Sequence, residues 1–151
     1  MKRLLASPVI NAVCIGIFTA FYASVFLMTS NRIEFASRPP IEEAASFWAV
    51  WSGFLAAGHQ QYIACALAAV TILIIVLLLI RRRHYDEYHI SVLTHCIVAA
   101  AVLTLAAIAA FYLMILCEPA AIIEKFTLFI TIHWTTVVFA DLTYVLLYRW
   151  R

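Results

Sequence analysis

The sequence contains little charge and few of the residues that break helices. Only 12% of its 151 residues are charged, and it has 3 glycines and 4 prolines. A soluble globular domain carries about 25% charged residues, whereas 66% of this chain is hydrophobic and its mean hydropathy is +1.01. A soluble core of this size cannot bury so much apolar surface, so we expect an integral membrane protein.

Complete catalytic and cofactor-binding motifs are also missing. The net charge is only +2, and the basic residues lie beside the apolar segments, where they suit lipid head groups better than nucleic acid. The four cysteines, Cys14, Cys65, Cys96 and Cys117, form no CxxC motif, so we expect free thiols. These absences argue against nucleic acid as a partner and against an enzyme.

Four apolar segments are long enough to cross a bilayer, which requires about 20 helical residues. They cover residues 8–29, 60–80, 89–117 and 122–148. Backbone amides in lipid must be satisfied internally, so each segment is predicted to be helical even where Val, Ile and Thr are frequent. We predict an all-α integral membrane protein, a four-transmembrane-helix bundle, in which residues 1–151 form a single membrane domain and residues 81–88 a short loop.

Basic residues flank these segments on one side of the membrane. Lys2 and Arg3 precede the first segment, residues 81–83 are all arginine, and Arg149 and Arg151 follow the last segment. Because positive charge favours the cytoplasmic side, both termini and the arginine loop are predicted to be cytoplasmic. The short chain with basic ends indicates a bacterial inner membrane.

The connection between the first two segments contains its own apolar stretch, which is too short to span. Residues 41–57 are predicted to form an amphipathic helix that lies at the interface or re-enters the membrane. Its aromatic face would anchor it at the head groups: Phe47, Trp48, Trp51 and Phe54. One continuous helix over residues 41–80 is the alternative.

The last apolar segment carries the most polar residues. Six of them share one arc of a helical wheel, here called the polar stripe: Glu124, Thr127, Thr131, Trp134, Thr135 and Asp141. A polar arc in a membrane helix is expected to face protein or water, so we predict that it lines a pathway, with His133 on another face. Glu124 and the neighbouring Lys125 are expected to snorkel to the outer boundary.

A polar site is predicted in the inner half of the membrane. Counting 1.5 Å per residue, Asp141 and His95 lie at about the same depth, about 10 Å from the cytoplasmic boundary. Asn11, Ser91 and Thr94 fall near that level. The site is interpreted either as an ion or proton site or as hydrogen bonding between helices.

Haem and metal are both argued against. A haem b held by two histidines needs them at one depth, but His133 and His95 differ by about 10 Å. The loop that contains Asp86 and Glu87 matches no zinc spacing, so no metal site is predicted.

The pattern favours an oligomeric channel or transporter for ions, protons or small solutes. The alternative is a non-catalytic interaction, assembly or sensor subunit. A membrane-embedded redox or lipid-modifying enzyme is the least favoured, because no nucleophile, base and oxyanion donors are seen to converge. The expected partners are the lipid bilayer and either further copies of this chain or another membrane protein.

Overall fold

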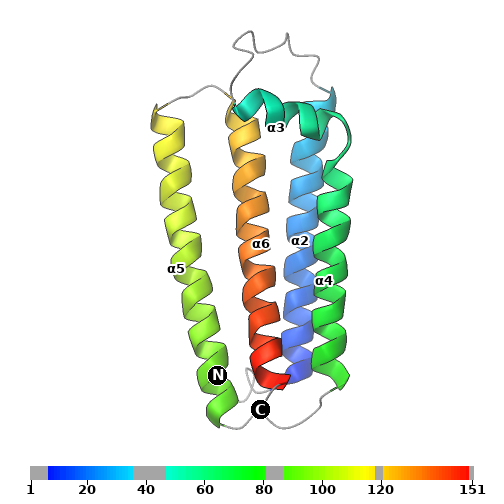
Figure 1. The fold of residues 1–151 in the computed structure, drawn as a ribbon, viewed down its shortest axis with the longest axis vertical. Coiled ribbons are helices and arrows are strands. Elements are labelled where there is room, and N and C mark those ends of the chain that lie inside the picture. The colour runs from blue at the N-terminus through cyan, green and yellow to red at the C-terminus, as the bar shows by residue number, and fades with distance from the viewer. Residues whose placement is uncertain (1–6, 36–46, 81–86, 118–120, 150–151) are drawn as a thin grey trace.

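The computed structural model describes residues 7–35, 47–80, 87–117 and 121–149, and these residues are helical apart from short turns. Four long helices lie side by side: α2 (Pro8–Phe35), α4 (Gln60–Ile80), α5 (Glu87–Cys117) and α6 (Ile122–Arg149). A short helix, α3 (Phe47–Ala56), lies across one end of this set (Figure 1). The prediction of an all-helical chain is confirmed for the described residues. Each long helix is long and apolar enough to cross a membrane.

The helix bounds follow local signals. The start of α2 has Ser7 before Pro8, and the carbonyl of Ser7 accepts the N–H of Asn11 at 3.1 Å. Proline is favoured at the first helical position because its missing N–H is not needed there. The helix continues to Phe35, six residues past the predicted end, while α4 has the predicted bounds 60–80.

A turn separates α3 from α4, so the alternative of one continuous helix over residues 41–80 is wrong. Gly58 has a φ of 80°, in the left-handed region that glycine adopts without a steric penalty. Its N–H donates to the carbonyl of Leu55 at 2.9 Å, which closes the end of α3. Residues 41–46, the predicted beginning of α3, lie outside the described residues.

Three of the long helices form the packed core. α2, α4 and α6 all contact one another, and α3 contacts α2 and α6 at the end where it crosses them. Phe26, Ile74 and Trp134 are among the completely buried apolar side chains in this core. α5 packs against α6 and makes no comparable contact with the other described helices. It stands at the edge of the molecule in Figure 1.

The two ends of the structure contain different helix ends. α2 begins and α6 ends at the same end, and α3 lies at the opposite end (Figure 1). This arrangement follows from an even number of crossings. The arginines at 81–83 on which the orientation was predicted lie outside the described residues. The end with α3 is called the outer end, and the end where α6 finishes is called the inner end.

Candidate functional site

Polar side chains from three helices are buried together near the outer end. This outer polar layer consists of Ser30 on α2, Gln60 on α4, and Glu124 and Thr127 on α6, each at most 1% exposed. Both hydroxyls bond within their own helices: Ser30 donates to the carbonyl of Phe26, and Thr127 lies 2.6 Å from that of Ile123. Buried polar groups of this kind are costly in a membrane and need a structural or functional reason.

Lys125 ties three helices together beside this layer. Its side chain is 2% exposed, and its Nζ donates to the carbonyl of Met114 on α5 at 3.4 Å. That carbonyl is in the last turn of α5, where helix carbonyls lack intrahelical partners and favour a cation. The Nζ also lies 5.4 Å from the centre of the Trp48 ring on α3. The expectation that Glu124 and Lys125 snorkel is wrong, because both side chains are buried, and Trp48 of α3 lies over Lys125.

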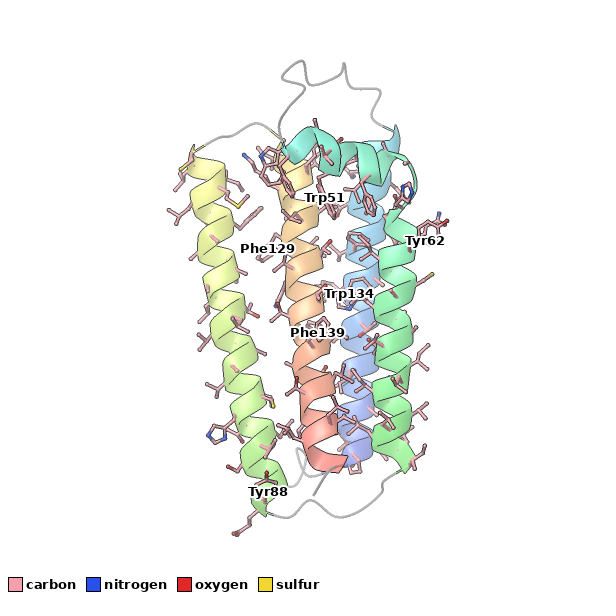
Figure 2. The ribbon with its side chains drawn as sticks, in the orientation of Figure 1. Trp51, Tyr62, Tyr88, Phe129, Trp134 and Phe139 are labelled. Atoms are coloured by element: carbon pink, nitrogen blue, oxygen red, sulfur yellow. The ribbon has the colours of Figure 1, made fainter. Side chains whose placement is uncertain are left out.

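An apolar plug lies below the outer polar layer. It consists of Phe26 and Trp134, which are completely buried and whose rings lie 6.3 Å apart. Figure 2 places Trp134 midway along α6, on the side toward α2. The plug therefore separates the outer polar layer from the inner half of the core.

A hydrogen-bonded pair of threonines joins α2 to α4 at the level of the plug. The hydroxyls of Thr19 and Thr71 lie 3.3 Å apart, and Thr71 donates to the carbonyl of Leu67 at 2.8 Å. Because Thr71 has only one hydroxyl proton, Thr19 must be the donor between the two. The pair is fully satisfied.

His133 on α6 is held by a tyrosine of α2. The hydroxyl of Tyr22 lies 2.7 Å from Nδ1 of His133. Phe18 stacks on Tyr22 at 4.3 Å, and Phe129 lies 5.9 Å from the imidazole. The sequence analysis missed this partner. Depth alone would have placed them only roughly together, because at 1.5 Å per residue Tyr22 lies about 20 Å and His133 about 16 Å from the outer ends of their helices.

Asp141 is the residue of the polar stripe nearest the inner end. Its side chain is half-buried, and its neighbours on the helix face toward the core, Val138 and Val145, are buried. It makes no hydrogen bond or ion pair with any residue that the structure describes.

The rest of the polar stripe faces protein to different degrees. Glu124, Thr127 and Trp134 are buried, and Thr131 and Thr135 are half-buried. Thr131 donates to the carbonyl of Thr127 at 2.9 Å. Thr135 lines a cavity of about 410 Å³ between α5 and α6. The stripe thus turns toward helices rather than outward.

The other residues of the predicted inner site are placed elsewhere. Ser91, Thr94 and His95 are exposed on α5, and Asn11 is half-buried on α2. The Nδ1 of His95 lies 2.7 Å from the carbonyl of Ser91, and Thr94 donates to its own helix. No hydrogen bond or ion pair joins His95 to Asp141. The structure therefore separates the two central members of the predicted site.

The aromatic residues of α3 divide between surface and interior. Phe47 and Phe54 are exposed, while Trp48 and Trp51 are half-buried. Trp51 packs against the hydrophobic core and stacks on Phe54 at 5.7 Å. Figure 2 shows Trp51 beneath α3, pointing into the molecule. Of the four predicted anchors, Trp51 is therefore also a core contact.

No group of three or more His, Cys, Asp or Glu side chains among the described residues is arranged to hold a metal ion. All four cysteines are free. No protein-family model matches the chain, and neither curated proteins nor solved structures give a match. The arguments for function therefore come from the geometry of this chain.

Proposed function

We propose that the protein moves protons or a small cation across a membrane along the interior of α2, α4 and α6, and that it works as an oligomer. The observation that carries this proposal is Asp141, a carboxylate inside a predicted span that makes no hydrogen bond or ion pair with any described residue. Ionisable groups within membrane spans are costly, and they commonly mark ion pathways and proton relays.

The layered interior supports the same proposal. Along α6, Glu124 lies about 15 Å outside Trp134, and Asp141 about 10 Å inside it. A polar outer layer, an apolar plug and an inner carboxylate are the parts that a gated pathway needs. The plug would keep the two polar ends from being open at the same time.

The tight packing of this interior favours a small passenger. The side chains of Phe26 and Trp134 at the plug, and of Ile74 further inward, are completely buried. The four long helices are also continuous, whereas substrate carriers often break helices at their binding sites. A proton or a monovalent cation suits such a core better than a larger solute.

The membrane and the orientation are part of the proposal. The four long apolar helices suggest a bilayer as the solvent. The common end of α2 and α6 is compatible with two cytoplasmic termini, and we place the chain in a bacterial inner membrane on the basis of its basic ends.

Flux through proteoliposomes tests the proposal. The purified protein is reconstituted, and proton or potassium entry is followed with a pH-sensitive or potassium-sensitive dye. Asp141→Asn should abolish the flux, and Asp141→Glu should keep part of it. Glu87→Gln is the control, because Glu87 is exposed at the first position of α5. Wild-type liposomes that stay tight to both ions would reject the proposal.

An interaction or assembly subunit is the second candidate, and one observation favours it. Among the described helices, α5 packs mainly against α6, and none of the residues in its most apolar stretch is buried. A membrane helix with so little contact is suited to receive a partner helix. Tight liposomes together with stable retention of a partner during purification would favour this candidate over transport.

A further inference from the structure

The face of α5 opposite α6 carries polar side chains at a position that would otherwise meet lipid. The residues along this face are spaced alternately by four and three positions, and all of their side chains are exposed: Ser91, His95, Val98, Val102, Leu105 and Ala109. Every helix has residues at this spacing, so the spacing alone does not distinguish this face; the residue types do. The apolar members suit lipid, whereas Ser91 and His95 lie inside the predicted span that starts at Ile90.

Hydrogen bonding fixes what this polar pair offers. A carbonyl can only accept, so the 2.7 Å contact with Ser91 O requires that Nδ1 of His95 carries the proton. In the neutral imidazole, Nε2 is then an acceptor. Neither Nε2 of His95 nor the hydroxyl of Ser91 has a partner among the described residues. The α5 face therefore presents one free acceptor and one free donor, one helical turn apart.

We infer that this face of α5 binds a second copy of the chain, through reciprocal hydrogen bonds from the Ser91 hydroxyl of each copy to Nε2 of His95 in the other. Two copies inserted in the same direction are related by an axis along the membrane normal. Each residue then meets its symmetry mate at the same depth. Because helical side chains lean toward the N-terminus, the imidazole of His95 leans toward the level of Ser91.

Among the described helices, α5 packs mainly against α6, and that contact is loose. Two cavities, of about 410 and 200 Å³, lie along its seam with α6, so the α6 side of α5 is incompletely filled. Steps of four and three residues are those of left-handed helix pairs, the common geometry in membrane proteins. The inference deepens the proposed function, because it names the subunit contact, and it rests on the same placement of α5 in a membrane.

Single cysteines test this contact in membranes. In a variant whose four native cysteines are replaced by alanine, Val98→Cys and Val102→Cys should form disulfide-linked dimers on oxidation with copper phenanthroline. Ile97→Cys is the matched control, since Ile97 is 50% exposed but lies on another side of α5. Equal crosslinking at 97 and 98 would overturn the inference, as would a lack of crosslinking at both 98 and 102.

A second set of variants tests the hydrogen bonds themselves. In the Val102→Cys background, Ser91→Ala or His95→Leu should lower the dimerisation equilibrium constant about eightfold, the equivalent of two bonds of about 0.6 kcal/mol each. Ser91→Thr, which keeps the hydroxyl, should retain crosslinking. Unchanged crosslinking in Ser91→Ala would overturn the reciprocal pair.

The same membranes separate this inference from the transport proposal. Asp141→Asn in the Val102→Cys background should crosslink normally while flux is lost. Normal crosslinking by a protein that conducts nothing would leave the α5 contact standing and remove the transport proposal. Flux from a protein that does not crosslink at 98 or 102 would leave the transport proposal standing and remove the α5 contact.

Discussion

The indole ring of Trp48 on α3 lies over the ammonium group of Lys125 on α6, with Nζ 5.4 Å from the ring centre. The same ammonium group donates to the carbonyl of Met114 near the end of α5. One buried cation on α6 thus contacts both the short helix α3 and the peripheral helix α5.

Replacing Trp48 with leucine should therefore loosen α3. A desolvated cation–π contact contributes up to about 2 kcal/mol, so we expect the free energy of unfolding to fall by about 1–2 kcal/mol. Unfolding of the reconstituted protein by SDS, followed by tryptophan fluorescence, measures the change. Phe47→Leu is the matched control, because the neighbouring Phe47 is 58% exposed. Equal losses in both variants would show that the contact with Lys125 contributes nothing specific.

The bond between Tyr22 and His133 leads to a second prediction. Tyr22→Phe removes the hydroxyl but keeps the ring that stacks on Phe18. Hydrogen bonds between membrane helices contribute about 0.6 kcal/mol on average and at most about 1.7, so we expect a loss in that range. Tyr62→Phe on the 72% exposed Tyr62 should have no effect. The ¹⁵N chemical shifts of His133 should move only in the first variant, and unchanged shifts there would contradict the bond.

The apolar plug is tested by opening it. Trp134→Ala removes a completely buried ring and should lower the free energy of unfolding by about 3–5 kcal/mol. If the plug gates a pathway, the same variant should also leak protons or potassium in proteoliposomes, and Asp141→Asn should suppress that leak. Phe139→Ala, on a side chain that is 60% exposed, is the control on the same helix. A destabilised protein that remains tight would show that the core is packing and not a pathway.

The sequence was sufficient to predict the long helices, because hydropathy alone controls which segments can be buried in lipid. The bounds of α4 are those predicted, and α5 and α6 begin or end within two residues of the predicted ones. The end of α2 was missed because its last turn includes Asn31 and Arg32, which are poor candidates for the hydrocarbon region. A helix can continue past the lipid, and hydropathy does not report that continuation.

The candidate site was predicted less well, because a helical wheel gives the faces of a helix but not its neighbours. The polar stripe of α6 was recognisable, but the wheel could not show that Trp134 packs on Phe26 of α2 or that Thr135 lines a cavity with α5. His95 was paired with Asp141 by depth, but rotation of α5 turns the imidazole outward, onto Ser91. Burial of Lys125 depends on where α3 folds, and no periodicity in α6 encodes that.

A pair of glycine substitutions tests the turn between α3 and α4. Gly58 has a φ of 80°, whereas Gly53 lies within α3, and an added Cβ meets nothing within 4 Å at either position. Backbone preference alone should therefore decide the outcome. Gly58→Ala should cost about 1–2 kcal/mol, the penalty of a left-handed residue with a side chain. Gly53→Ala should stabilise by about 0.5–1 kcal/mol, because alanine favours a helix. SDS unfolding of both variants measures these opposite signs. Stabilisation by both substitutions would instead mean that the backbone runs through residue 58 as one uninterrupted helix.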